Sequence, residues 1–280
     1  MRKKSRIQKL LAVALSLLLF GIVRTQSTAE TVSWSVTHPS EAPHAELTVI
    51  TYNIRGSRDD HGIANPLAIA DELKKLNGDI IALQEVDNGL PRSQFMNQAK
   101  MIADRLEMNY AYAPSVQYMV GNYGHAILSK YPIRSAQTIA LPSGQEQRTL
   151  LNAVIDVNGQ PLRMFETHLG LAQTERKSQM ASIQQLIDAS LERKELFLLA
   201  GDFNASANDP LFKQLDAELQ APFVREAQQL GSLRTCDKPE LIDQIFLSPG
   251  LSFKSGFSSD FDRSDHYPIG AQISLPLSNT

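Results

Sequence analysis

Oxygen-bearing side chains stand where several apolar runs of this chain begin or end. They form the short signatures Thr51-Tyr52-Asn53, Gln84-Glu85-Val86-Asp87, Thr167-His168-Leu169, Gly201-Asp202-Phe203-Asn204, Ile242-Asp243-Gln244 and Ser264-Asp265-His266. A carboxylate at the end of a buried strand loses hydration, which is unfavourable unless a cation compensates it. Mg²⁺ prefers oxygen ligands and needs only one or two carboxylates, whereas zinc favours His and Cys. Each signature alone is typical of a turn or a structural carboxylate, but together they predict a magnesium-type site.

No side chain is placed for covalent catalysis. The single cysteine, Cys236, has no histidine beside it in the sequence to activate its thiol, and it cannot form an intrachain disulfide. No serine stands in a nucleophile-elbow sequence. The expected chemistry therefore uses a water molecule activated by a histidine.

Strands and helices in mixed order must position these residues. Apolar runs predict strands over 46–53, 79–86, 110–115, 124–129, 150–157, 162–168, 196–204, 241–248 and 267–274. Helical spacing predicts helices up to residue 76, over 93–106 and over 173–191, and Asn158-Gly159 predicts a hairpin turn. Hairpins between helices suit two packed sheets with outer helices better than one parallel sheet.

Three segments are predicted along the chain. Residues 1–29 combine a basic start, a 14-residue apolar run and small residues before a cleavage site after Ala29, which predicts a signal peptide. Residues 30–45 are predicted as a linker, and residues 46–280 as one domain. The apolar run is short for a membrane span. A secreted or extracytoplasmic protein is therefore expected, with an uncleaved N-terminal anchor as the alternative.

Removing the leader makes the chain strongly acidic. Residues 1–29 hold six of the 27 basic residues and none of the 30 acidic ones, so the remainder has 21 basic residues and a net charge near −9. An acidic protein has no general attraction for nucleic-acid phosphates. The charge favours a small or lipid-derived phosphate ester over DNA, although a locally basic cleft would still permit a nuclease.

Three signatures carry a resemblance to a known family. Leu83-Gln84-Glu85-Val86, Gly201-Asp202-Phe203-Asn204-Ala205 and Ser264-Asp265-His266 resemble motifs of the endonuclease/exonuclease/phosphatase superfamily, which includes pancreatic-type DNases and AP endonucleases. The resemblance spans residues 46–276. It implies a DNase-I-like α/β fold, a four-layer α/β/β/α sandwich of two mixed, mainly antiparallel sheets with outer helices.

The resemblance implies a metal site. Glu85 is expected to be the principal ligand of Mg²⁺, or alternatively Mn²⁺, with Asn53 and Asp265 as further ligands. Arg55 departs from the family pattern, because some nucleases of the superfamily carry Asp at this position. The change removes one metal ligand and makes an AP-endonuclease activity less expected.

The resemblance also implies catalytic roles. His266 is expected to activate water or stabilise the phosphate, with Asp243 orienting its imidazole. Asp202 and Asn204 would bind the attacking water and a phosphate oxygen. His168 would contact the phosphate and protonate the leaving oxygen.

Four further residues near the signatures are candidates for binding phosphate or substrate: Arg176, Arg148, Arg92 and Asn122. Arginine suits phosphate because its guanidinium can donate two parallel hydrogen bonds. A surface ion pair explains such an arginine equally well. Of the three arginines, Arg176 is the strongest candidate for binding phosphate, because it begins a helix beside the His168 loop.

The predicted activity is metal-dependent hydrolysis of phosphate esters, as a phosphodiesterase or phosphatase. The expected partner is a phosphate-ester substrate, with no obligatory protein partner and a monomeric chain. A secreted DNA or RNA endonuclease is the main alternative. An inactive binding module of the same fold is disfavoured because Glu85, Asp202 and His266 are all present. A zinc hydrolase of another fold would need a helix-borne His-Glu-x-x-His, which the sequence lacks.

Overall fold

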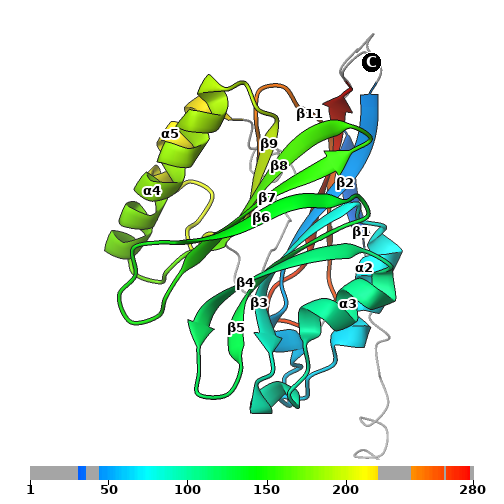
Figure 1. The fold of residues 1–280 in the computed structure, drawn as a ribbon. Coiled ribbons are helices and arrows are strands. Elements are labelled where there is room, and N and C mark those ends of the chain that lie inside the picture. Colours follow the sequence, from blue (N-terminus) through cyan, green and yellow to red (C-terminus); the bar gives the residue numbers. More distant parts are fainter. Residues whose placement is uncertain (1–30, 36–43, 220–240, 262, 278–280) are drawn as a thin grey trace, which may run out of the picture. The chain divides into compact units, whose positions relative to one another are not determined.

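Two packed β-sheets with helices on both outer sides form the described part of the chain (Figure 1). The computed structural model describes residues 31–35, 44–219, 241–261 and 263–277. The predicted signal peptide and Cys236 lie outside these residues. The order of layers is helices, sheet, sheet, helices, which confirms the predicted DNase-I-like sandwich.

The first sheet has seven strands in the order β1-β11-β12-β2-β3-β5-β4. Their bounds are β1 (Thr31–Ser35), β2 (His44–Asn53), β3 (Ile80–Asn88), β4 (Asn109–Gln117), β5 (Asn122–Ser129), β11 (Ser252–Ser259) and β12 (Ile269–Pro276). Only β2 and β3 run parallel to each other, and the other neighbours are antiparallel. The parallel pair carries the ends of both strands, and hence Asn53 and Glu85, to one edge of the sheet.

The second sheet repeats this arrangement with five strands in the order β10-β9-β8-β7-β6. Their bounds are β6 (Ile133–Ala140), β7 (Thr149–Val157), β8 (Gln160–His168), β9 (Phe197–Asp202) and β10 (Asp243–Leu247). Here β8 and β9 form the parallel pair. The hairpin between β7 and β8 turns at Asn158 and Gly159, both with positive φ, as the Asn-Gly signal predicts.

Two pairs of helices complete the sandwich. The helices α2 (Pro66–Leu76) and α3 (Gln98–Leu106) cover the first sheet, and α4 (Gln173–Glu192) and α5 (Lys213–Glu218) cover the second (Figure 1). Asn65 caps α2 by accepting a hydrogen bond from the backbone of Ala68, and Asn77 ends it in a left-handed conformation. None of the helices in the described ranges is long and apolar enough to span a membrane.

Three buried apolar clusters hold the layers together. One lies between the sheets and includes Val49, Ile127 and Met164. A second lies beneath α4 and includes Phe203, Phe212 and Phe246, and the third lies beneath α2 and α3. Because a cluster fills each gap between layers, the strand ends at one edge of both sheets have fixed positions.

The structure corrects three local predictions. Thr31–Ser35 fall in the predicted linker but pair with β11, and β2 already begins at His44. The helix predicted over 93–106 starts later, because Pro91–Ser93 form a separate 3₁₀ turn, η2, and Asn97 caps α3. The strands β6 and β11 were not predicted, because β6 is mostly exposed and β11 is largely polar, so neither has an apolar run.

Candidate active site

The second sheet sets three predicted residues in one row. His168 at the end of β8 stands beside Asp202 at the end of β9, and Asp202 stands beside Asp243 at the start of β10. All three side chains are buried. The row arises because β8 and β9 run parallel while β10 returns antiparallel, which brings three distant segments to one sheet edge.

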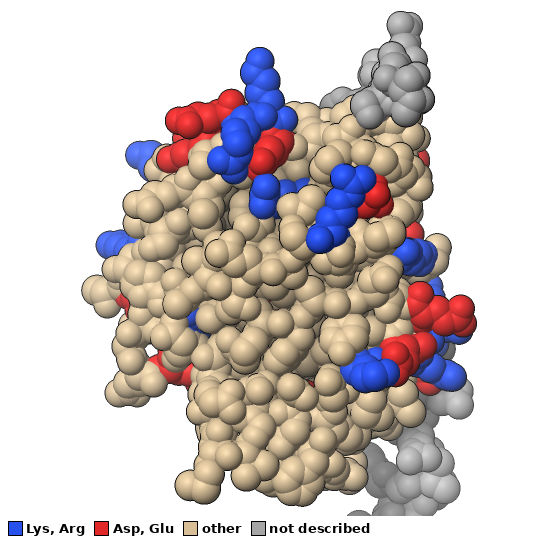
Figure 2. All heavy atoms as spheres, in the orientation of Figure 1, with Lys and Arg blue, Asp and Glu red and all other residues tan. Residues whose placement is uncertain are grey.

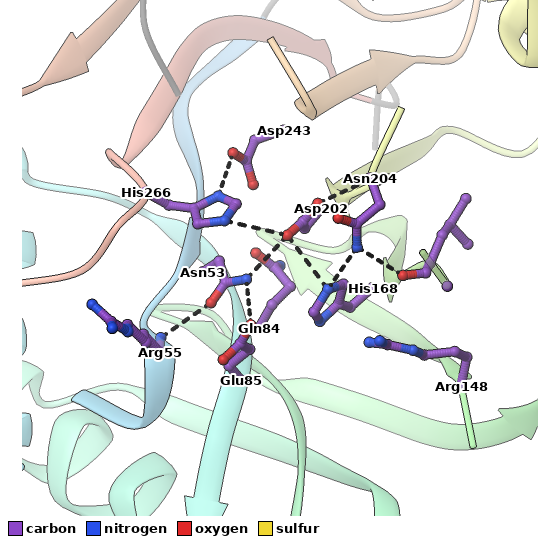
Figure 3. Close-up of polar contacts among 12 residues, drawn as sticks. Asn53, Arg55, Gln84, Glu85, Arg148, His168, Asp202, Asn204, Asp243 and His266 are labelled. Atoms are coloured by element: carbon purple, nitrogen blue, oxygen red, sulfur yellow. Dashed lines mark hydrogen bonds and ion pairs between the residues drawn. The ribbon is translucent and has the colours of Figure 1, made fainter. Parts of the chain in front are cut away.

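The side-chain amide of Asn53 connects the two sheets at this edge. Its Nδ2 donates hydrogen bonds to Oε1 of Glu85 and to Oδ2 of Asp202, both at 3.0 Å. Its Oδ1 accepts from the backbone nitrogen of Arg55 at 3.1 Å. The amide therefore holds a carboxylate of each sheet within reach of one small volume (Figure 3).

His266 is held between two carboxylates. Its Nδ1 lies 2.8 Å from Oδ2 of Asp243, and its Nε2 lies 3.6 Å from Oδ2 of Asp202. Burial disfavours the charged imidazolium, but the carboxylates of Asp243 and Asp202 outweigh burial and raise the pKa of His266 to about 10. The arrangement matches a histidine oriented by Asp243 with its other nitrogen facing the cluster.

His168 lies on the opposite side of Asp202. Its Nε2 is 3.4 Å from Oδ2 of Asp202 and 3.0 Å from Nδ2 of Asn204. Burial, followed by the nearby cation of Arg148, lowers the pKa of His168 well below its usual value. Burial thus favours the neutral form of His168, whereas the neighbouring carboxylates favour the charged form of His266.

The Gly-Asp-Phe-Asn signature shapes this side of the cluster. A Cβ atom on Gly201 would stand 1.9 Å from the carbonyl oxygen of Thr167, so β9 approaches β8 too closely for any other residue. Asn204 has a φ of 49° and donates from Nδ2 to the carbonyl oxygen of Leu169 at 2.9 Å. The glycine and the left-handed asparagine thus place Asp202 against His168.

Ser264 connects the loop of His266 to β2, a role that the sequence did not reveal. Its hydroxyl donates to the carbonyl oxygen of Asn53 at 2.7 Å. Its neighbour Asp265 is half exposed, with Oδ2 4.0 Å from Nε of Arg55. Asp265 therefore lies at the mouth of the cluster, and the structure keeps it as an outer rather than a central candidate ligand.

The comparisons with known proteins agree with this geometry. The pattern of the Endonuclease/Exonuclease/phosphatase family matches residues 50–266. The chain belongs to this family. A relative, YbhP of Escherichia coli (strain K12), is 28% identical over 228 residues, which cover 74% of this chain and 87% of YbhP.

Two solved structures share the fold. An endonuclease/exonuclease/phosphatase from Beutenbergia cavernae has a TM-score of 0.69 at 22% identity, covering 82% of this chain and 72% of that chain. The human Nocturnin catalytic domain with bound sulfate anion has a TM-score of 0.68 at 18% identity, covering 90% and 99%. At these identities the similarity supports the family's sandwich fold.

The carboxylates of this family member fit a divalent cation. Burial raises the pKa of Glu85, which the Asn53 amide counteracts and the Asp202 carboxylate reinforces. Burial and the Asp243 carboxylate raise the pKa of Asp202 to about 6. Oδ1 of Asp243 is buried and has no hydrogen-bond partner in the described part of the chain. Closely spaced acidic groups of this kind are stabilised by a hard cation with oxygen ligands.

Two different sets of ligands occur in this cluster. Asp202, Asp243 and His266 also offer ligand atoms within 4.8 Å of one another. Both nitrogens of His266, however, already face carboxylates: Nδ1 is hydrogen-bonded to Asp243 and Nε2 lies at ion-pair distance from Asp202. The Glu85 carboxylate accepts its one described side-chain hydrogen bond from the neutral amide of Asn53, and Glu85 with Asn53 is therefore the better candidate for the metal.

Arg148 is the predicted phosphate-binding residue that reaches the cluster. Its guanidinium lies beside His168 (Figure 3), its side chain is 8% exposed, and its Nη2 pairs with Oε1 of Glu146 at 3.0 Å. It also borders a cleft of about 770 Å³. The cleft lies between the loops after β6 and β8 and is lined by residues that include Pro142, Ser143, Glu146, Leu171 and Glu175.

The other three predicted substrate residues have structural partners. Arg92 makes a two-pronged ion pair with Asp87, at 2.9 and 2.7 Å. Arg176 donates from Nη1 to the carbonyl oxygens of Gly170 and Leu171 and so supports the loop that follows His168. Asn122 accepts a hydrogen bond from the hydroxyl of Tyr112 at 2.8 Å. The contacts described for these three lie outside the cluster, and Arg176 is placed in the loop after His168.

Proposed function

We propose that this protein is an exported, Mg²⁺-dependent hydrolase of phosphate esters. The observation that carries the proposal is the Asn53 amide, which joins Glu85 of one sheet to Asp202 of the other beside the Asp243–His266 pair. Phosphate-ester hydrolysis requires an oriented water, neutralisation of the phosphate oxygens and a stabilised leaving group. This cluster supplies residues for each requirement.

The metal would be held by Glu85, with Asn53 and Asp265 close by. When bound, the divalent cation neutralises charge on the phosphate and on the leaving oxygen. Mn²⁺ is the expected substitute for Mg²⁺, because it accepts the same oxygen ligands. Asp265 is half exposed, so it would contribute a ligand from the solvent side of the cluster.

The side chains of the cluster would have the remaining roles in the reaction. Asp243 fixes the ring of His266, so that Nε2 points to the side of Asp202 where an attacking water would be held. Asn204 and Asp202 orient that water and one phosphate oxygen. His168, buried beside Arg148, contacts the phosphate, and Arg148 adds a cation at the boundary of the cleft.

Two observations favour a small or lipid-derived ester. The cleft beside Arg148 has the size of a pocket for a small organic group, which suits the alcohol portion of an ester. The hairpin between β4 and β5 exposes Tyr118, Met119 and Val120, and no Lys, Arg, Asp or Glu occurs between Glu107 and Lys130. Figure 2 shows this lower part of the face without charged side chains.

A nucleic-acid substrate is the second candidate, supported by the family but not by the charges. Three arginines around the cluster are each paired with a carboxylate: Arg55 with Asp60, Arg148 with Glu146 and Arg263 with Asp59. Paired arginines give little net attraction for a phosphate backbone. A nuclease activity would have to depend on the metal and on local contacts.

Export is proposed from the sequence of residues 1–29, with cleavage after Ala29. The alternative is retention of this segment as an N-terminal anchor. N-terminal sequencing of the protein from a membrane-free extracytoplasmic fraction distinguishes the two. A mature chain that starts at Glu30 supports export, and an intact N-terminus in the membrane fraction supports the anchor.

A hydrolysis panel tests the activity. The purified protein would be incubated with Mg²⁺, Mn²⁺ or EDTA and with plasmid DNA, RNA, sphingomyelin, phosphoinositides and a chromogenic bis-phosphodiester. EDTA-sensitive cleavage that Glu85→Ala lowers by at least about a hundredfold is the expected result. Nicking of DNA as the main activity would select the nuclease alternative. Equal turnover by Glu85→Ala and the unchanged chain would refute the proposed metal ligand.

A further inference from the structure

Glu85 occupies an unusual backbone position. Its φ is +57° although it lies within strand β3. The pairing of β3 with β5 passes from Leu83–Ala126 to Val86–Gly124, so Gln84 and Glu85 together face the single residue His125. This is a β-bulge, in which one extra residue re-aims a side chain. A left-handed non-glycine residue persists only where its surroundings fix it.

The residue before Glu85 is fixed by buried hydrogen bonds. Nε2 of Gln84 donates to Oγ1 of Thr51 at 3.1 Å and to Oε1 of Glu166 at 2.9 Å. Gln84, Thr51 and Glu166 are all fully buried. Glu166 lies on β8 in the opposite sheet, so the bulge of the first sheet is tied to the second.

The residue that faces the bulge lies beside the same carboxylate. Nδ1 of His125 lies 3.4 Å from Oε1 of Glu166, and its Nε2 lies 2.8 Å from the hydroxyl of Ser115. That hydroxyl in turn lies 2.6 Å from Oγ1 of Thr149 on β7. Both sides of the bulge are thus anchored to the second sheet.

A carboxylate in such a position requires an explanation. Glu166 has no solvent exposure, and burying a charge is unfavourable unless it is paired and hydrogen-bonded. It stands two residues before His168 on the same strand, so both side chains point to the same face of β8. Glu166 therefore lies directly below the site that contains Glu85, His168 and Asp202.

We infer that Glu166 is a positioning residue, which holds the β3 bulge through Gln84 and His125 and so aims the Glu85 carboxylate at the metal. This inference rests on the proposed metal site. Partners of metal ligands outside the coordination shell typically change metal affinity by about 10- to 100-fold when they are removed. The consequence is a metal affinity that depends on a residue of the opposite sheet.

The test is the affinity of the purified protein for Mn²⁺, measured by the electron paramagnetic resonance of free Mn²⁺ during a titration. Glu166→Ala is expected to weaken binding by about 10- to 100-fold, and excess Mn²⁺ should restore much of the hydrolysis of the chromogenic diester. Glu166→Gln is expected to stay close to the unchanged chain, because its amide oxygen still accepts from Gln84.

Glu72 offers a matched control. It is a buried glutamate on α2, whose Oε1 accepts from the hydroxyl of Ser259 at 2.9 Å. Glu72→Ala should lower thermal stability and leave Mn²⁺ affinity unchanged. If Glu166→Ala behaves like Glu72→Ala, the inference is overturned and Glu166 serves stability alone.

A second variant keeps the test decisive if Glu166→Ala does not fold. Gln84→Met removes the same hydrogen bond from the other partner and should weaken Mn²⁺ binding to a similar extent. Unchanged Mn²⁺ affinity in Gln84→Met would also overturn the inference. If the unchanged chain and Glu85→Ala bind Mn²⁺ equally, the proposed metal site itself fails, which separates the two failures.

Discussion

Asp243 and His266, 23 residues apart in the sequence, contact each other through Oδ2 and Nδ1 at 2.8 Å. They act on the proposed reaction as one unit, because the carboxylate fixes the ring that faces the attacking water. Asp243→Asn is expected to lower kcat by about 10²- to 10⁴-fold, the range for losing a positioned acid–base group. His266→Ala should do the same.

The double variant of this pair gives the sharper result. Since each single change disables the same unit, Asp243→Asn combined with His266→Ala should be no slower than His266→Ala alone. The measurement is steady-state kinetics on the chromogenic diester, with circular dichroism to verify folding and Glu192→Gln on the exposed end of α4 as the control. If the fold-loss of kcat in the double variant equals the product of the two single losses, the two residues act separately.

Removal of the metal should lower stability as well as activity. The carboxylates of Glu85, Asp202 and Asp243 lie close together, so a cation relieves their repulsion in the folded state only. Mg²⁺ at a hundred times its Kd should stabilise the protein by about 2.7 kcal/mol, which corresponds to a Tm rise of roughly 5–10 °C for a domain of this size. Calorimetry with and without EDTA measures the rise.

The control for the metal effect is KCl at equal ionic strength, which should leave the Tm nearly unchanged. Glu85→Ala should remove most of the rise caused by Mg²⁺. A rise of the same size in Glu85→Ala would place the stabilising ion elsewhere in the protein.

Gly201→Ala should damage both the fold and the site. The added methyl group would stand 1.9 Å from the carbonyl oxygen of Thr167, so β8 and β9 must separate. Overpacking of this kind costs about 1–3 kcal/mol, and the displaced Asp202 should lower kcat/KM at least about tenfold. Urea unfolding and kinetics measure the two effects.

Gly144→Ala is the matched control for this change. Its added methyl group would meet nothing closer than Oε1 of Glu175, at 3.4 Å. Stability should stay near that of the unchanged protein, and only stability is compared for this variant because Gly144 lines the cleft beside Arg148. Equal losses in the two variants would mean that the close approach of β9 to β8 is not the cause.

The ion pairs of Glu195 predict a pH dependence of stability far from the active site. Partial burial opposes its charge, but the guanidinium groups of Arg193 and Arg163 lower the pKa of Glu195 to about 2. A carboxyl group whose folded pKa is lowered stabilises the fold above its unfolded pKa, and this contribution is lost as the pH falls towards 2.

Glu195→Gln isolates this contribution. At pH 7 the substitution should reduce the free energy of unfolding by about 1–2 kcal/mol, a value discounted for partial exposure of the pair. The difference from the unchanged protein should shrink between pH 5 and pH 2 in urea titrations. A difference that stays constant over this range would rule out the ion pairs as its source.

Parts of the site could be read from local sequence. The Gly-Asp-Phe-Asn and Ser-Asp-His signatures mark strand ends, and the structure places Asp202, Asp243 and His266 together as expected. The arginines were less predictable, since Arg92 satisfies Asp87 five residues away, whereas Arg148 reaches His168. A sequence shows that an arginine is present but not which acceptor its long side chain finds.

By itself, the sequence determined the chemistry available to this protein and the kind of elements that carry it. Apolar periodicity fixed most strands and helices, because local spacing decides which face of an element is buried. Only the tertiary structure decided that the amide of Asn53 lies between Glu85 and an aspartate 149 residues away. It also decided that Glu166 of one sheet supports a bulge in the other, because sheet packing brings together residues that no local pattern relates.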